Sequence, residues 1–314
     1  MRKWIIDTDT GGDDAAALMI AAASPDIEIL GVTTVCGNVP LAQATQNALM
    51  ALETAGAAVP VYCGAAQPLM RAPHNSVGVY GADGMGDCGL IHPAGHPQPM
   101  HAVDFIRHAV AQYPDEIEII ALAPATNIAL AIMQDRETMR HVKHIWSMGT
   151  GGFGPGNATP VAEFNVYIDA DAYAVMLDSG IPITIAGFDL CVGSAAFRPD
   201  ELERMRATPQ GRFLTDATRK LRAYNERRNG VSCVDLPDAV ALTAALMPDL
   251  IQAQTDCFCY CCKTEEATYG QVIMYETGME YEGSGVTARR NAAVIRQIDS
   301  DRFKRYFMHL FAEA

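Results

Sequence analysis

Four aspartates fall within eight residues near the start of the chain; they are Asp7, Asp9, Asp13 and Asp14. The apolar run Trp4–Ile6 before them predicts a strand, and the Ala-rich stretch Asp13–Ala23 predicts a helix. Helix capping and an Asx turn account for one or two of these acids, but not for four like charges at one turn. Because oxygen ligands without a nearby His or Cys suit a hard cation, the cluster predicts a site for Ca²⁺ or Mg²⁺, or for a ligand rich in hydroxyl donors.

Other polar side chains follow later strand-like runs of the chain. They are Asn38, Thr126, Asn127, Asn157, Glu163 and Asn165. Each has an ordinary alternative, since Asn38 suits a turn and Thr126 suits a helix N-cap. Ligands of open α/β sheets bind beyond the carboxyl ends of the strands, so we expect these groups to surround the aspartates. Such a ring suits a small polyhydroxylated ligand above a metal ion.

The elements that must position these residues alternate between strand and helix. Strands are expected at Trp4–Ile6, Ile27–Val35, Val59–Cys63, Ile117–Leu122, Ile145–Met148 and Ile181–Ala186, and helices at Asp13–Ala23, Leu41–Ala55, Ala102–Gln112, Asn127–Met133 and Ala170–Leu177. Beyond them we expect helices at Pro199–Arg206, Arg212–Arg228, Ala239–Leu246 and Arg302–Phe311, and strands at Gln254–Lys263, Gln271–Tyr275 and Ala293–Ile298. The pattern predicts an α/β fold: an open, mainly parallel Rossmann-like sheet with helices on both faces and a C-terminal extension, in one domain over residues 1–314.

Composition and charge exclude several classes of protein. A formal charge of −14 argues against nucleic acid or an anionic membrane as partner. We expect no membrane span and no signal peptide, because apolar runs are short and a strand begins within a few residues. The nine cysteines suggest reduced thiols and a cytoplasmic protein. Cys257, Cys259 and Cys261 alternate as one strand face does, so we interpret them as structural, not as a zinc site.

The first acidic motif, D-T-D-x-G-x-D-D, resembles that of the calcium-dependent nucleoside hydrolases. The similarity continues from about residue 3 to the end of the chain. It includes T-V-x-G-N at Thr34–Asn38, A-P-A-T-N-I-A at Ala123–Ala129, G-N-A-T-P-x-A-E-F-N at Gly156–Asn165 and the late Pro237-Asp238. The resemblance implies an enzyme that hydrolyses the N-glycosidic bond of ribonucleosides to ribose and free base with a Ca²⁺-bound water. It also implies a homodimer or homotetramer.

The resemblance assigns roles residue by residue. Ca²⁺ would be bound by Asp9, Asp14, the backbone carbonyl of Thr126 and the carboxylate of Asp238. Asp9 would also be the general base, and Asp7 would support the loop. The ribose would be held by Asp13, Asn38, Asn157, Glu163 and Asn165, with Met148 and Phe164 lining its pocket.

The half of the site that would bind the base departs from the family pattern. Pro237 stands where many members carry a His, and Tyr80 precedes Gly81 where many carry another. The stretched late segment also leaves Asp235 as an alternative to Asp238. Possible base contacts are Tyr80, Tyr224 and Arg228, beside a loop over Asn229–Pro237 that could act as a lid. We therefore expect a preference for purine ribonucleosides or for good leaving groups.

Two other functions are compatible with parts of the sequence. Asp7-Thr8-Asp9-Thr10 superficially fits a D-x-D phosphatase, in which Asp7 would be the nucleophile with Mg²⁺. That reading leaves Asp13, Asp14 and the E-F-N segment unexplained. The changes at Pro237 and Tyr80 favour a second alternative, a protein that binds ribonucleosides without turning them over.

Overall fold

A computed structural model describes residues 1–281 and 289–313 of the chain. Its strands form one sheet in the order β3-β2-β1-β4-β5-β6-β9-β7-β8. The strands are β1 Arg2–Thr8, β2 Ile27–Thr34, β3 Val61–Cys63, β4 Ile117–Ala121, β5 His144–Met148, β6 Ile183–Ala186, β7 Ile251–Cys261, β8 Val272–Glu276 and β9 Ala292–Ile298. Neighbours from β3 to β9 are parallel, and β7 is antiparallel to both of its neighbours. The predicted fold class is confirmed.

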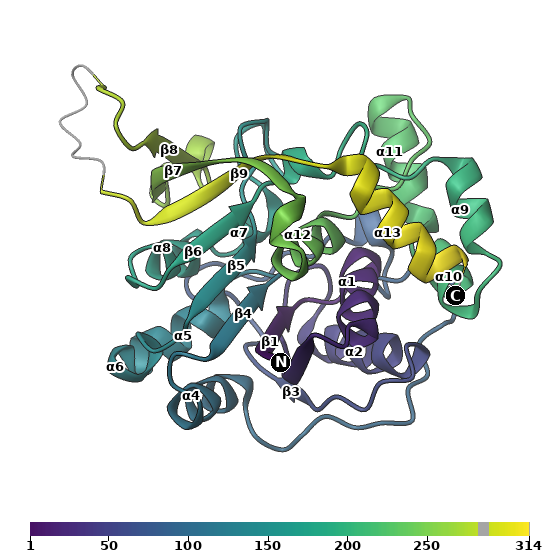
Figure 1. Ribbon diagram of the computed structural model, residues 1–314, viewed down its shortest axis with the longest axis horizontal. Helices are drawn as coiled ribbons and strands as arrows, with labels where there is room; N and C mark the ends of the chain where they lie inside the picture. The colour runs from purple at the N-terminus through teal and green to yellow at the C-terminus, as the bar shows by residue number, and fades with distance from the viewer. Residues whose placement is uncertain (282–288, 314) are drawn as a thin grey trace.

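Helices connect the strands and cover both faces of the sheet (Figure 1). They are α1 Gly12–Ala23, α2 Leu41–Thr54, α3 Val77–Tyr80, α4 Ala102–Gln112, α5 Thr126–Gln134, α6 Arg136–Met139, α7 Phe164–Ile168, α8 Ala170–Leu177, α9 Pro199–Met205, α10 Pro209–Ala217, α11 Arg219–Asn229, α12 Pro237–Leu246 and α13 Ser300–Ala312. No helix among these described residues is both long and apolar enough to cross a bilayer.

Side-chain alternation along β1 divides the core between the two faces. Trp4 and Ile6 pack with residues of α1, α2 and α12 in one cluster. Ile5 between them packs with residues of α4, α5 and α8 in the other. Figure 1 shows α4, α5 and α6 on one side of the sheet and α1, α2 and α12 on the opposite side. A strand buried on both faces reads as a continuous apolar run, which is why β1 was recognisable in the sequence.

Strand β1 lies between β2 and β4, where the order of the strands reverses direction. Connections leave this point toward opposite faces, and the resulting crevice at the carboxyl ends of the strands is where such sheets bind ligands. The four aspartates follow β1 directly and therefore stand at this switch point. The predicted C-terminal extension continues the sheet, because β9 pairs in parallel with β6 and in antiparallel fashion with β7.

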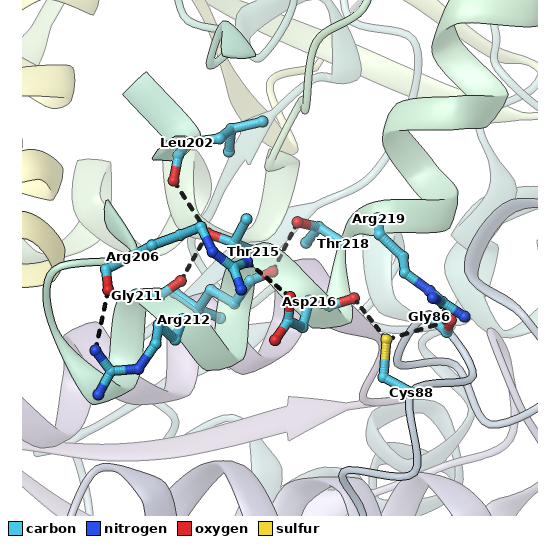
Figure 2. A network of polar contacts seen from close by, with 11 residues as sticks. Gly86, Cys88, Leu202, Arg206, Gly211, Arg212, Thr215, Asp216, Thr218 and Arg219 are labelled. Atoms are coloured by element: carbon cyan, nitrogen blue, oxygen red, sulfur yellow. Dashed lines mark hydrogen bonds and ion pairs between the residues drawn. The ribbon is translucent and has the colours of Figure 1, made fainter. Parts of the chain in front are cut away.

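The prediction of one helix over Arg212–Arg228 is wrong, because the chain turns at Thr218 between α10 and α11. At this turn the carbonyl of Asp216 accepts a hydrogen bond from the Cys88 thiol at 3.4 Å, as Figure 2 shows. A Cβ on Gly86 would lie 2.5 Å from that same carbonyl oxygen. The bend thus lets the helical segment pack closely against the loop that follows β3. Nothing in the sequence around Thr218 predicts this tertiary contact.

Candidate active site

A cavity of about 660 Å³ opens at the carboxyl ends of the parallel strands. It is bounded by the loop after β3, by the loop between β5 and α7, and by α11. Of the residues predicted to function, those that line it are Asp13, Asn38, Tyr80, Met148, Asn157, Glu163, Phe164, Asn165, Tyr224, Arg228, Asp238 and its alternative Asp235. Asp9, Asp14 and Thr126 do not line the cavity and are fully buried. The structure therefore brings these cavity-lining groups together at one place.

The carboxylates of Asp13, Asp14 and Asp238 form a compact group. One oxygen of each lies within 4.8 Å of the others, and no further group of this kind is found among the described residues. Asp14 is held by Thr8 Oγ1, which donates to its Oδ1 at 2.6 Å, and by the Gly11 N–H, which donates to its Oδ2 at 2.8 Å. Asp9 lies outside this group and accepts a hydrogen bond from the Asn38 N–H at 2.5 Å.

Burial and mutual repulsion disfavour the charged forms of these acids. Burial, followed by the charge of Asp14, raises the pKa of Asp13 to about 7. The same two causes, in that order, raise the pKa of Asp9 and of Asp238 well above the usual range. Four buried carboxylates this close need either protons or a compensating positive charge.

Unpartnered oxygens at this position fit a cation. In the described part of the chain, Asp9 Oδ1, Asp13 Oδ1 and Asp238 Oδ1 are buried and lack a hydrogen-bond partner. Buried polar atoms are almost always satisfied, so these oxygens in and beside the compact group fit a site that binds a cation. Carboxylate oxygens are donors that hard cations prefer. The late acid of the cluster is Asp238, because the Asp235 carboxylate lies apart from it and accepts a hydrogen bond from Asn225 instead.

Amide and carboxylate groups beside the cluster are held in fixed orientations. Ser76 donates to Asn38 Oδ1 at 2.7 Å, while Asn38 Nδ2 donates to Asp14 Oδ2 at 3.3 Å. Asn165 Nδ2 donates to the Leu122 carbonyl at 2.8 Å. Glu163 caps the N-terminus of α7, and its carboxylate accepts hydrogen bonds from the Asn165 N–H at 3.0 Å. These contacts preorganise polar groups around the cavity before any ligand binds.

The side of the cavity nearest α11 carries the residues predicted as possible base contacts. Tyr80, predicted as a possible base contact, donates its hydroxyl to Asp13 Oδ2 at 2.9 Å and so also supports the acid cluster. Tyr224 and Arg228 lie one helical turn apart on α11, and Arg228 Nη1 lies 3.4 Å from the Tyr224 hydroxyl. Pro237 begins α12 directly before Asp238.

Sequence reasoning missed several residues that line the cavity. They include Ser76, Tyr167, Phe188, Asp189, Val192 and Leu221. Asp189 could have been found, since it follows β6 as the other polar groups follow their strands; its Oδ2 accepts from the Phe153 N–H at 2.9 Å. His74 lies in the loop after β3, matches no family motif, and nevertheless lines the cavity. Asn127 instead braces the structure, because its Nδ2 donates to Asp7 Oδ1 at 2.8 Å.

A Rossmann-like sheet with a buried cluster of acids at its switch point, beneath a cavity lined with polar groups, defines an α/β protein with a site suited to a cation and a small polar ligand. Residues 4–305 match the inosine-uridine preferring nucleoside hydrolase family, and the chain belongs to this family. The predicted class, a hydrolase of the N-glycosidic bond of ribonucleosides, is thereby confirmed. Asp7, the nucleophile of the phosphatase alternative, is buried and does not line the cavity.

Similar proteins differ in the base that their names specify. The chain is 38% identical to uridine nucleosidase 1 of Arabidopsis thaliana, over 79% of this chain and 75% of that protein. A plant nucleoside hydrolase superposes with a TM-score of 0.91 at 27% identity, covering 100% of this chain and 99% of the other. A purine-preferring ribonucleoside hydrolase from Gardnerella vaginalis gives 0.89 at 28% identity, covering 99% and 98%. Family membership therefore does not fix the base.

Proposed function

We propose that this protein hydrolyses ribonucleosides with Ca²⁺ bound by Asp9, Asp14, Asp238 and the Thr126 carbonyl. The observation that carries the proposal is the set of unpartnered oxygens on Asp9, Asp13 and Asp238 beneath a cavity lined with amides and carboxylates. Asp13, which is proposed to hold the ribose, belongs to the compact group with Asp14 and Asp238. This supports a site in which the ion and the ribose are neighbours. Ca²⁺ suits such a site better than Mg²⁺ because it accepts many oxygen ligands in an adaptable shell.

Bound there, Ca²⁺ would fix the two vicinal ribose hydroxyls and make a coordinated water more acidic. Asp9 is the general base, because its Oδ1 has no other partner among the described residues and can take the proton of the attacking water. Asp13, Asn38, Asn157, Glu163 and Asn165 hold the ribose, and Met148 and Phe164 line its apolar surface.

Cleavage of the glycosidic bond develops positive charge on the sugar ring. The carboxylates of Asp13 and Glu163 and the amide oxygens beside them favour that charge electrostatically. Their hydrogen bonds within the protein hold them in place, so little reorganisation accompanies the reaction. Water thus attacks one face of the sugar ring and the base departs from the opposite face, as in inverting glycosidases.

A substrate comparison tests this proposal. Ribose release from uridine, inosine and p-nitrophenyl riboside is measured with Ca²⁺ and with a calcium chelator, alongside the matching 2′-deoxynucleosides. We expect the ribosides to be cleaved with Ca²⁺ and not with the chelator. The deoxy compounds should be cleaved roughly several hundredfold more slowly or worse, because their missing hydroxyl leaves dedicated polar groups unsatisfied. Asp9→Ala should abolish turnover. Calcium-dependent binding without any release would instead favour the binding-protein alternative.

Location and assembly are proposed separately from the chemistry. We expect a cytoplasmic enzyme, because free cysteines occur throughout the chain. Its assembly as a homodimer or homotetramer rests on the family resemblance. A monomeric mass by light scattering at micromolar concentration would contradict that assembly and leave the proposed reaction untouched.

A further inference from the structure

Asp235 is a buried acid of the cavity wall that lies outside the compact group of carboxylates. Its neighbours Val234 and Leu236 both belong to the hydrophobic core. Val234 is fixed by two backbone hydrogen bonds with Phe197, at 2.8 and 2.9 Å. Because successive side chains of an extended segment point to opposite sides, Asp235 points away from that core and toward the cavity that it lines.

Asn225 on α11 fixes one oxygen of this carboxyl group. Its Nδ2 donates to Asp235 Oδ1 and, at 3.2 Å, to the carbonyl of Cys233, and the side chain of Asn225 is itself buried. No hydrogen bond joins Asp235 Oδ2 to another of the described residues, yet this oxygen is not among their sealed, unpartnered atoms. The carboxyl group therefore has one anchored oxygen and one that is open to the cavity.

Charges of both signs surround Asp235. Burial raises its pKa to about 6, while hydrogen bonds to its carboxylate act in the opposite direction. Asp13 on α1 raises this pKa and Arg228 on α11 lowers it. The thiols of Cys191 and Cys233 also lie near it. A carboxyl group in such surroundings can hold a proton close to neutral pH and still give it up.

The other polar side chains of this wall are poorer proton donors. Pro237 has no proton to give, and the guanidinium of Arg228 does not lose its own. Tyr80 already donates its hydroxyl to an acid of the cluster, and burial raises its pKa well above the ordinary value. His74 is exposed, and no side-chain hydrogen bond within the described part of the chain orients it. Asp235 is the donor that the fold both buries and orients.

We propose that Asp235 is the general acid that protonates the departing base, a role that Pro237 cannot fill. This inference rests on the function proposed above. With the ribose hydroxyls at the acid cluster, the base extends from C1′ toward the wall that α11 completes. Asp235 stands between the two, since it is close enough to Asp13 for that charge to affect its pKa and is anchored by Asn225 of α11.

The protons and electrons of this step balance between two carboxyl groups. Water attacks C1′ and gives one proton to the Asp9 carboxylate. The C1′–N bond breaks, its electron pair passes into the base, and the Asp235 carboxyl group gives its proton to a ring nitrogen or oxo group of that base. The products are ribose and the neutral base. Asp9 then loses a proton to solvent and Asp235 regains one, which restores the starting state.

Substrates that differ in their need for a proton test this assignment. Asp235→Asn keeps the shape of the side chain and an oxygen for Asn225, but it has no acidic proton. We expect it to lower kcat/KM for inosine and uridine by between about a hundredfold and ten-thousandfold, the usual range for general acid catalysis. The rate with p-nitrophenyl riboside, whose leaving group needs no proton, should change by less than about threefold. Glu226→Gln, at an exposed acid of α11 that does not line the cavity, is the matched control and should change neither rate.

The pH dependence of the wild type gives a second test that needs no variant. Only the protonated acid can donate, so kcat/KM for inosine should fall as pH rises through the pKa of Asp235. The rate with p-nitrophenyl riboside should lack this fall. Identical pH profiles for the two substrates would overturn the proposal, even if Asp235→Asn did not fold.

Calcium binding separates this role from that of a metal ligand. Asp235→Asn should keep the full calcium-induced rise in Tm. Loss of that rise, or equal losses of activity on all three substrates, would mean that Asp235 supports the metal site, and either result overturns the proposal. A loss confined to the nucleosides in His74→Gln, with Asp235→Asn unaffected, would do the same. If the wild type cleaves no riboside, the proposed function itself fails. If it cleaves all three and Asp235→Asn does so equally well, only the present inference fails.

Discussion

Glu163 shows how one buried acid in the cavity wall affects the stability of the fold. The side chain is 2% exposed, yet its carboxylate accepts backbone hydrogen bonds from Asn165 and from Val166 at the start of α7. Burial outweighs these bonds and raises its pKa from an ordinary value of 4.5 to about 7. The folded state therefore holds this proton more tightly than the unfolded chain does.

This pKa shift predicts a pH-dependent loss of stability. The stabilising contribution is fully present below pH 4.5 and is lost as pH rises through about 7. At pH 8 the deficit is of the order of 3 kcal/mol, from the size of the shift. Glu163→Gln cannot ionise, so its free energy of unfolding relative to wild type should rise between pH 4.5 and 8. Urea unfolding of the chelator-treated proteins measures this, and a pH-independent difference would contradict it.

At the scale of single elements, the turn after β2 places Asn38 against the acid cluster. The chain passes so close to Asp9 that a Cβ on Gly37 would lie 2.0 Å from Asp9 Oδ2. Glycine alone leaves room for the neighbouring Asn38 N–H to donate to that oxygen. The Gly-Asn pair in the T-V-x-G-N motif is therefore a requirement of packing as well as of chemistry.

The variant Gly37→Ala should displace the Asp9 carboxylate. Because the obstacle is a buried side chain pinned by hydrogen bonding, we expect destabilisation of about 1–3 kcal/mol, the usual range for overpacking. We also expect a drop in kcat larger than the rise in KM, since the base is misplaced while the ribose contacts remain. Thermal unfolding and steady-state kinetics measure the two effects. A variant with wild-type kcat would show that Asp9 is not the base.

Most helices and strands could be predicted from the sequence, but one break between helices could not. Strands such as β4, which is apolar except for Glu118, were recognisable because burial on both faces favours a nearly continuous apolar run. The acids and amides at strand ends were recognisable because parallel strands bring their carboxyl ends together. The division between α10 and α11 was not, since the segment that turns there contacts Gly86 and Cys88, which lie far away in sequence. For the same reason, the sequence could not place His74 at the cavity wall.

At the scale of the whole molecule, the acid cluster couples metal binding to folding. The chain carries a net charge of −14, and in the fold several of its acids are buried side by side. Mutual repulsion among Asp9, Asp13, Asp14 and Asp238 opposes folding until a cation or protons offset it. An ion that binds the folded chain alone stabilises it by mass action, by about 2.7 kcal/mol at a hundred times its Kd.

Calcium should therefore raise the midpoint of thermal unfolding, and a chelator should lower it. For a chain of this size the expected rise is about 5 °C at a hundred times the Kd, with a smaller one for Mg²⁺. Asp238→Asn removes one charge from the cluster, so it should unfold at a higher temperature than wild type when both are treated with chelator, yet gain little from calcium. Scanning calorimetry at constant ionic strength measures all four states. If NaCl of matched ionic strength gave the same rise, or if Asp238→Asn kept the full calcium shift, the cluster would not be the metal site, because general screening or another site would then explain the stabilisation.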